Sequence, residues 1–379
     1  MSAASLKTTP AEAAFAEAFA KREPTQARRV AWDAYARTGL PHRRMEEWRW
    51  SDLRRASDRF ADAIIPGQDK VALTSGRAPD ERVALAEAPE APMPALAGAL
   101  AETVLRFRVE KGDPPLSFEV EALAGAGHHV IEIEVAEGVE ARVEERYVGE
   151  DGAFANVALR FRVEPGARLG RIVRQPASPG AVIVSTASIE LARDAALTQT
   201  VLAFGAALSR LETHVTHTGR GSRAVLDGAY LLDGSLHADL TTVVSHAGPG
   251  SVTKQLTKGA VRDQATGVFQ GRIVVERGAQ KTDARMGHHA LLLTEGAAVN
   301  AKPELEIYAD DVACAHGNTA GALDPAQIFY LQSRGLPEKQ AKALVTEAFI
   351  AEAFERVADE SVRRTLLDEV RAWLARNAP

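Results

Sequence analysis

The sequence predicts a mainly β fold in which a parallel β-helix is flanked by N-terminal and C-terminal helical regions. Turn residues recur at positions 138, 166, 194, 221, 250 and 278, with spacings of 28, 28, 27, 29 and 28 residues. Between these turns, apolar and polar residues alternate as in strands, for example in Val130–Val135 and Val157–Val163. A period of this length is typical of a solenoid, whose coils stack and bury a continuous core. A β-sandwich is the alternative, but its strands usually recur about every 8–12 residues.

Composition narrows the classes of function. The chain has 379 residues, of which 46% are hydrophobic and 25% charged, as expected for two or three globular domains or one large β domain with appendages. A net charge of −6 argues against a nucleic-acid partner. The single cysteine excludes an internal disulfide and fits a reducing cytoplasm. Met1–Pro10 lacks the pattern of a signal peptide, and no apolar run reaches the ~18 residues of a membrane span.

Four consecutive segments are expected. We predict an N-terminal helical region at 1–62, a connector at 63–101, the β-helix at 102–323 and a C-terminal helical region at 324–379. In the first segment, Phe15 and Phe19 lie one helical turn apart, and Thr25 is placed to cap a second helix. The connector is rich in Ala and Pro, with room for a few short strands. Because a solenoid needs covered ends, we expect the helical regions to cap it, although a partner chain could also cover an open edge.

Tryptophan and arginine concentrate in one short segment. Gly39–Trp50 holds two of the four tryptophans, Trp48 and Trp50, among charged neighbours. These residue types are frequent at the energetic centres of interfaces, so the segment is a candidate contact for a partner. The alternative is that the tryptophan pair anchors the helical arm to the body of the protein.

Helix signals dominate the last segment. Asp324 and Pro325 are an N-cap followed by the residue favoured at the first helical position. Gly335 is expected to end that helix, and Pro337 to begin the next. A third helix is expected around Val362–Leu374. Short amphipathic helices of this kind suit either capping or docking to a partner.

The segment Asp310–Gly317 holds the only cysteine, Cys314, and a histidine two residues later, His316. In an extended chain these two side chains share one face, about 7 Å apart, so they could bind one iron, copper or zinc ion. Closed zinc sites and ordinary iron–sulfur clusters need about four ligands, so the others would come from another chain, the solvent or a substrate. The alternative is a small buried cysteine and a histidine that caps a strand end.

The other candidate residues predict no catalytic site. His214 and His217 would face opposite sides of a strand, as would the adjacent pairs His128–His129 and His288–His289. His237 and Asp239 would share a face. The chain has no phosphate-binding loop, nucleophile elbow or His-Glu-x-x-His motif. It is therefore interpreted as a scaffold and not as an enzyme.

Long motifs resemble the SufB/SufD family of iron–sulfur cluster assembly proteins. The resemblance is closest in Lys302–Asp324 and Phe329–Gly335. Further matches are His246, Lys258-Gly259, Val268–Arg272, Ala279–Thr282 and Gly39–Trp48. Within the family, the Cys-x-His-Gly sequence and the single cysteine favour the SufD branch. Asn318, Ala320 and Ala322 depart from the residues usual in the family, but Cys314 and His316 are retained.

The resemblance implies a right-handed parallel β-helix, a SufB-like partner along the β-helices and a SufC-like ATPase docked on the C-terminal helices at about 325–350. It also implies that His316, with Cys314 beside it, contacts transient iron or a nascent iron–sulfur cluster shared with the partner chain. Three alternatives remain: a purely structural partner of SufB, a homodimer that acts alone, and a β-helix enzyme of polysaccharides. The missing signal peptide and the missing cluster of acids argue against the last.

Overall fold

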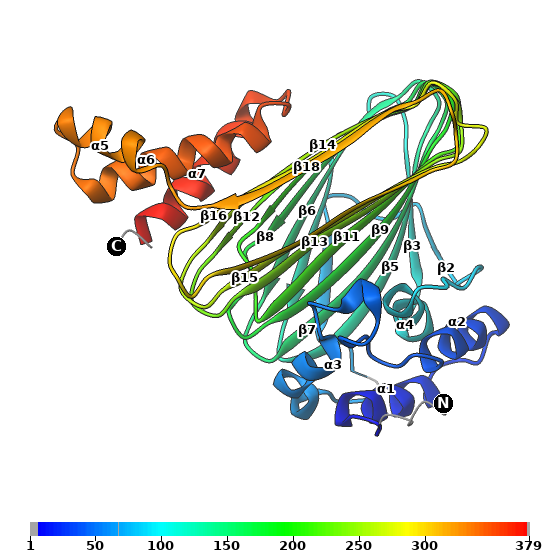
Figure 1. Ribbon diagram of the computed structural model, residues 1–379. Helices are drawn as coiled ribbons and strands as arrows, with labels where there is room; N and C mark the ends of the chain where they lie inside the picture. Colours follow the sequence, from blue (N-terminus) through cyan, green and yellow to red (C-terminus); the bar gives the residue numbers. More distant parts are fainter. Residues whose placement is uncertain (1–6, 67, 377–379) are drawn as a thin grey trace, which may run out of the picture.

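The computed structural model describes residues 7–66 and 68–376, and their fold is a parallel β-helix of about 8 turns (Figure 1). The described residues form two sheets, each of nine strands, and from β3 onward successive strands of the chain alternate between them. The two sheets face each other and enclose the core. The predicted fold class, with helices at both ends of the chain, is confirmed. Residues 1–6 of Met1–Pro10, where no signal peptide is expected, lie outside the described residues.

The two sheets are called sheet A and sheet B. Sheet A consists, in spatial order, of β1 (Val71–Ser75), β4 (Leu116–Ala122), β6 (Glu140–Gly149), β8 (Arg168–Gln175), β10 (Ala196–Ala203), β12 (Arg223–Leu232), β14 (Val252–Val261), β16 (Asp283–Leu292) and β18 (Ala313–Gly321). Sheet B consists of β2 (Glu81–Val83), β3 (Val104–Val109), β5 (Gly125–Val135), β7 (Ala153–Val163), β9 (Val182–Leu191), β11 (Leu208–His217), β13 (His237–His246), β15 (Thr266–Val275) and β17 (Ala298–Ile307). β1 and β2 are antiparallel to their neighbours, and the other pairs are parallel.

The predicted turn series has a backbone cause. Gly138, Gly166, Asp194, Gly221 and Gly250 all have φ between 57° and 73°. This left-handed region is open to glycine and tolerated by aspartate. Each of the five backbone N–H groups donates to a carbonyl of the next coil, at distances of 2.8–3.1 Å. The turns therefore stack like the strands, and their period is the period of the solenoid.

The sixth member of the series, Gly278, also lies in a turn, but its backbone differs from that of the other five. Gly278 does not have a positive φ, and Lys281 (φ 65°) occupies the left-handed position of that coil. The register shows the reason, because Val252 pairs with Asp283, a spacing of 31 residues. The coils from Val252 onward are therefore longer than the earlier ones, since Thr266 pairs with Ala298 and Asp283 with Ala313, spacings of 32 and 30 residues. The position of Gly278 in the sequence does not reveal this change.

Inward-facing residues of both sheets form one continuous core. Phe118, Phe161 and Phe269 belong to it and are at most 2% exposed. Full burial of such a side chain contributes about 1.5–3 kcal/mol. The core continues through every coil to β17 and β18, where Leu305 and Cys314 are only half-buried. The last coil is thus the place where the core meets the surface.

The N-terminal helices pack on the outer face of sheet B. They are α1 (Pro10–Ala20), α2 (Gln26–Ala36), η1 (Glu46–Trp48), α3 (Leu53–Ala56), η2 (Ser57–Arg59), η3 (Ala61–Ala63) and α4 (Pro92–Leu100). The predicted cap of the second helix is confirmed, since the Thr25 side chain accepts a hydrogen bond from the Arg28 N–H. Phe15 joins the outward-facing Phe154 of β7 in a second apolar cluster.

The sequence did not predict α4, which lies in a segment interpreted as connector. Its residues Met93 and Ala95–Leu100 are all buried between α2 and sheet B. A helix that is apolar on every side has no amphipathic period to reveal it. Tertiary packing therefore fixes this helix.

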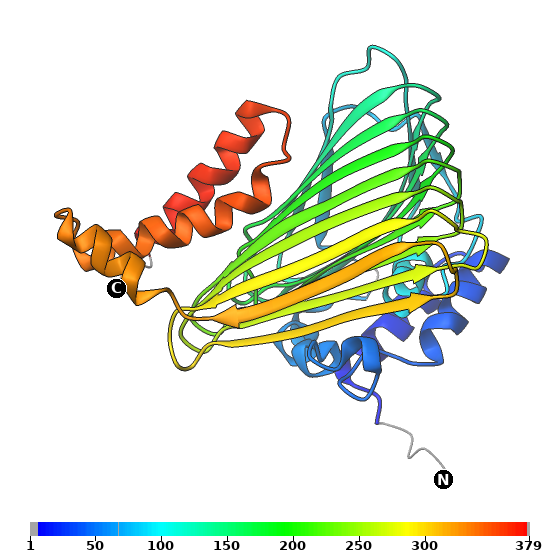
Figure 2. The ribbon, with the colours of Figure 1, turned by 45° about the horizontal axis from the view of Figure 1, so that its top comes forward.

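The C-terminal helices pack on the outer face of sheet A, opposite the N-terminal ones (Figure 1). They are α5 (Pro325–Ser333), α6 (Glu338–Ala351), η4 (Glu352–Phe354) and α7 (Glu360–Arg376). The cap at Asp324 is confirmed, because its carboxylate accepts from the Ala326 N–H at 2.8 Å. Phe354 and Trp373 bury their rings against sheet A, while α5 projects beyond it (Figure 2). No helix in the described residues combines the length and apolar character needed to cross a bilayer.

The helical regions do not cap the ends of the solenoid, so that expectation is wrong. They lie on its two outer faces, and the antiparallel strands β1 and β2 cover the first end. At the other end, β17 and β18 each pair with a single strand within the described residues. The last coil, drawn in orange in Figure 2, is therefore an open edge.

Candidate functional site

Cys314 and His316 both lie on the inward face of β18, in the last coil. β18 pairs in register with β16, so that Cys314 is opposite Ala284 and His316 is opposite Met286. Ala284 and Met286 are buried members of the core. The predicted shared face is confirmed, and it is the face that would continue the core if another coil followed.

The two side chains differ in their surroundings. Cys314 is half-buried and packs on the core, whereas His316 is exposed. Burial raises the pKa of the Cys314 thiol, the Ala284 N–H opposes this effect, and the charge of Asp283 adds to it. Among the described residues, His316 has no hydrogen-bond or ion-pair partner. The imidazole is therefore free to bind, while the thiol must lose a proton to become a ligand.

The described residues alone do not form a complete metal site. No group of three or more His, Cys, Asp and Glu side chains within the described residues could hold a metal ion. Cys314 and His316 could offer two ligands of different type, one soft and one borderline. A metal bound here would need further ligands from outside the chain.

The surface beside the two residues is a bare sheet edge. The backbone of β17 and β18 has one neighbouring strand instead of two. Ile307 and Tyr308, at the end of β17, are exposed. Unpaired strand edges with apolar side chains are templates for another chain. The site residues thus lie on a strand that is open to association.

The paired histidines point to opposite faces of their strands, as the two-residue period of a strand predicts. His217 is buried and His214 half-exposed, while His128 and His288 are buried beside half-buried neighbours. His217 stacks on His246 of the next coil with ring centroids 4.3 Å apart. Burial lowers the pKa of His246 to about 4. This pair is a neutral structural stack enclosed in the turn region of the solenoid.

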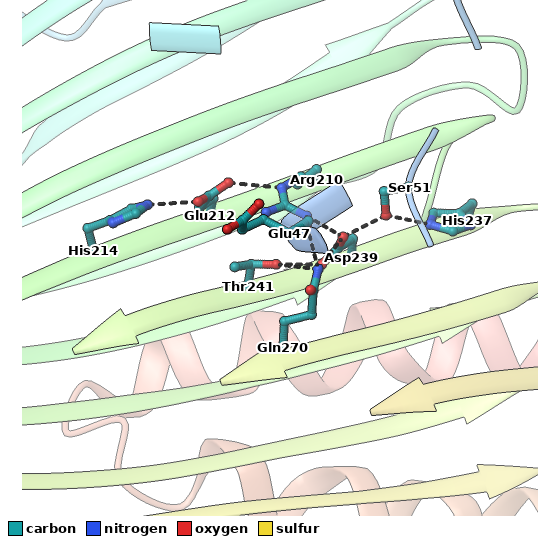
Figure 3. Close-up of polar contacts among 9 residues, drawn as sticks. All are labelled: Glu47, Ser51, Arg210, Glu212, His214, His237, Asp239, Thr241 and Gln270. Carbon is teal, nitrogen blue, oxygen red and sulfur yellow. Dashed lines mark hydrogen bonds and ion pairs between the residues drawn. The ribbon is translucent and has the colours of Figure 1, made fainter. Parts of the chain in front are cut away.

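A nine-residue polar cluster fills the space between the N-terminal arm and sheet B (Figure 3). It consists of Glu47, Ser51, Arg210, Glu212, His214, His237, Asp239, Thr241 and Gln270. Arg210 and Asp239 are fully buried, and their ion pair measures 2.7 Å. The predicted proximity of His237 and Asp239 is confirmed through Ser51, whose Oγ lies 3.0 Å from His237 Nε2 and donates to Asp239 Oδ2 at 2.6 Å.

This cluster is an anchor for the arm. The Trp48 ring covers the Arg210 guanidinium at 4.1 Å, and Arg210 Nη1 donates to the Glu47 carbonyl at 2.7 Å. Trp48 is 5% exposed, so it is not free to contact a partner. Of the two interpretations of the tryptophan segment, anchoring describes Trp48. The arm reaches β17 as well, because Glu46 pairs with Lys302 at 2.6 Å.

An apolar surface is exposed on the C-terminal helices. Phe329 and Tyr330 of α5 are 72% and 57% exposed, and Leu344 of α6 is exposed as well. Ile328, their neighbour in sequence, is buried. An exposed group of aromatic residues is typical of a protein-binding surface.

Sequence reasoning missed one interaction at the site. Asn318, two residues after His316, is hydrogen-bonded to His288, and His288 to Tyr230. The only signal in the sequence is the spacing. Asn318 lies two residues after His316 and four after Cys314, so on a strand all three side chains share a face. The partner of Asn318 lies 30 residues away and follows only from the strand register.

Comparisons with known proteins match most of the chain. The family model for "SUF system FeS cluster assembly, SufBD core domain" matches residues 119–349. The chain is 30% identical to the iron-sulfur cluster assembly protein SufD of Escherichia coli, over 88% of this chain and 89% of that protein. It is 28% identical to the SufBD family protein Rv1462 of Mycobacterium tuberculosis, over 86% and 87%. Against SufD of Bacillus subtilis the identity is 35%, over 35% of this chain and 30% of that protein.

The matched region runs from β4 into α6 and contains both Cys314 and His316. It includes the open edge and most of the solenoid. The chain therefore belongs to the SufB/SufD family of iron–sulfur cluster assembly proteins and, within it, is most similar to SufD.

Proposed function

We propose that this chain, whose family acts in iron–sulfur cluster assembly by the SUF system, is the SufD-like subunit of a SufB–SufC–SufD scaffold complex. It pairs with SufB, docks the SufC ATPase, catalyses no reaction of its own and works in the cytoplasm. The observation that carries the proposal is the position of Cys314 and His316 on the inward face of an open last coil. Transient iron or a nascent cluster is the cargo of that site.

The SufB interface in this proposal is the edge formed by β17 and β18. Each strand has free backbone groups on one side, so a second solenoid would extend both sheets across the junction. Ile307 and Tyr308 would become buried by the same contact. Without SufB, the edge would pair two copies of this chain as a homodimer. Mass measurement of the chain alone and with SufB distinguishes the two assemblies.

The SufC surface in this proposal is the exposed part of α5 and α6, within about 325–350. Phe329, Tyr330 and Leu344 provide an aromatic and apolar contact that the solenoid does not cover. β18 leads into α5 through residues 322–324, so the site strand and the docking helix are neighbours in sequence. We propose that ATP-dependent movement of SufC pulls on these helices and exposes the edge.

Ligand number explains why such a site suits a scaffold. A scaffold must hold a cluster long enough to build it and then release it. Cys314 and His316 supply two ligands, and SufB would supply the others, so separation of the chains removes part of the ligand set. The thiol of Cys314 is held in its protonated form by burial, which weakens it as a ligand until the metal displaces the proton.

The test is reconstitution of cluster assembly with His316→Ala. We expect a loss of cluster yield in an anaerobic SufB–SufC–SufD mixture while the complex still forms. Unchanged yield would refute the role of His316 as a ligand. Because His316 is exposed and unpaired among the described residues, its removal leaves the fold unchanged.

The alternative function is a purely structural partner that stabilises SufB without touching iron. Iron and sulfide content of the purified complex with Cys314→Ala and His316→Ala combined separates it from the proposal. A ligand role predicts loss of both elements from an intact complex. A structural role predicts wild-type content.

A further inference from the structure

Three hydrogen-bonded side chains form a line inside the last coils. Tyr230 of β12, His288 of β16 and Asn318 of β18 all belong to sheet A, in which β14 lies between β12 and β16. The Tyr230 hydroxyl lies 2.9 Å from His288 Nε2, and His288 Nδ1 lies 2.6 Å from Asn318 Oδ1. His288 and Asn318 are also partners in the strand register. The line therefore ends on the strand that carries Cys314 and His316.

The inner two members of the line are rigidly held. Tyr230 and His288 are fully buried, and His288 stacks on Phe269 with centroids 4.7 Å apart and parallel rings. Gly259 and Gly267 leave space for the Tyr230 ring, since a Cβ at either position would lie 2.2–2.4 Å from its atoms. Both rings are enclosed by packed neighbours, and the hydrogen bond from His288 links the exposed Asn318 to them.

In this line the Asn318 amide presents its oxygen, and not its nitrogen, to His288. Burial lowers the pKa of His288 to about 4 and so keeps the ring neutral, although the hydrogen bond to Asn318 raises that pKa. A neutral imidazole with Nδ1 on an amide oxygen carries its proton on Nδ1, and Nε2 then accepts from the Tyr230 hydroxyl. The Asn318 oxygen is thereby occupied. Nothing in the described residues accepts from Asn318 Nδ2, so its two N–H groups remain for a ligand.

Asn318 shares the inward face of the open edge with His316. Residues two apart on a strand lie about 7 Å from each other. An amide that is exposed, oriented and without an acceptor is a hydrogen-bond donor to a group bound beside His316. The acceptor that fits a cluster under construction is its sulfide, because hydrogen bonds to cluster sulfur stabilise the cluster and set its potential.

We propose that Asn318 is a third site residue of this chain, whose Nδ2–H donates to an inorganic sulfide of the nascent cluster, and that Tyr230 and His288 are positioning residues for it. This inference rests on the proposed function, since it requires cargo at the edge. In this proposal Asn318 contacts the sulfide of the cluster, whereas Cys314 and His316 contact its iron.

The rival interpretation is that Asn318 only ties β18 to β16. The chain offers a matched control at the next residue. Thr319 is bonded to His289 at 2.7 Å, across the same two strands but on their outer face. Replacing Thr319 removes an equivalent tie without touching the inward face. A structural role affects both variants alike, whereas a donor role affects only Asn318.

The first experiment measures sulfide retention in the reconstituted SufB–SufC–SufD complex carrying Asn318→Ala, Thr319→Val or His316→Ala. Loss of a hydrogen bond to a charged acceptor predicts sulfide release about tenfold faster in Asn318→Ala. Thr319→Val should release sulfide at the wild-type rate. Equal effects of both, or no effect of Asn318→Ala, overturn the inference. If His316→Ala lowers iron content while Asn318→Ala changes nothing, the proposed function stands without this inference.

The second experiment needs no cargo. Selective ¹⁵N-histidine labelling reports the tautomer of His288 in the full chain. We expect the proton on Nδ1, and a change of the His288 signals in Tyr230→Phe as well as in Asn318→Ala, but not in Thr319→Val. A proton on Nε2 would turn the amide oxygen of Asn318 outward and would overturn the donor role.

Discussion

Replacement of Asp239 by alanine tests the anchor that holds the N-terminal arm on sheet B. Asp239 Oδ2 accepts from Ser51 Oγ at 2.6 Å, from Arg210 Nη1 at 2.7 Å and from Gln270 Nε2 at 3.2 Å. Its removal leaves the buried Arg210 with Glu212 as its remaining ion-pair partner. Breaking a buried ion pair by removing one partner costs about 3–5 kcal/mol.

That cost should appear as local opening of the arm. At 1.4 kcal/mol per factor of ten, it raises the open population by roughly 10²- to 4 × 10³-fold. The assay is hydrogen exchange of the amides in Gly39–Ser51, which we expect to accelerate by that factor, while α7 stays protected. The matched control is Asp227→Ala. Asp227 is a buried carboxylate that pairs with Arg356 on the opposite face, so its removal should loosen the C-terminal helices instead.

Two results would refute this reasoning. One is unchanged exchange of the arm in Asp239→Ala, and the other is equal acceleration in Asp227→Ala. The double variant Arg210→Met with Asp239→Leu removes both charges of this buried pair and leaves Glu212 beside His214, so it should restore part of the protection. Continued rapid exchange in the double variant would show that lost contacts, and not the buried charge, cause the arm to open.

Three further predictions concern other parts of the chain. Burial lowers the pKa of His246 to about 4, so stability falls as the pH drops from 6.5 to 4 by about 3 kcal/mol. His246→Val, which introduces the residue found at this position in the next coil (Val275), should flatten that part of a pH series of urea unfolding. If α5 and α6 form the proposed SufC surface, Phe329→Glu with Tyr330→Glu should weaken SufC binding at least tenfold in calorimetry, with an unchanged melting temperature, because both side chains are exposed. Since burial raises the pKa of Cys314, iodoacetamide should label the isolated chain slowly near pH 7, with a rate still rising above pH 9.

The repeat was predictable because its cause is local. A residue that must adopt a positive φ is visible as glycine or aspartate, and five such residues mark five turns. The helix caps at Thr25 and Asp324 are local in the same sense. Gly278 shows the limit of this argument. A glycine fits many conformations, and only the pairing of Val252 with Asp283 shows that this coil is longer.

The site was predictable only in part. Strand parity places Cys314 and His316 on one face, but it does not say that this face belongs to an open last coil. The link between Asn318 and His288 needs the register of strands 30 residues apart. The contact of the Trp48 ring with the Arg210 guanidinium joins residues more than 150 positions apart in the sequence. Neither leaves a periodic signal in the sequence, because each is set by how whole elements pack.

The central claim is that this chain supplies half of a metal site that a second chain completes. The most direct measurement is pulsed electron–nuclear double resonance on the reduced cluster of the assembled complex, with ¹⁵N-histidine in this chain and natural-abundance SufB. We predict a ¹⁵N coupling from a bound imidazole that disappears in His316→Ala. A cluster that is present but shows no ¹⁵N coupling from this chain would contradict the account.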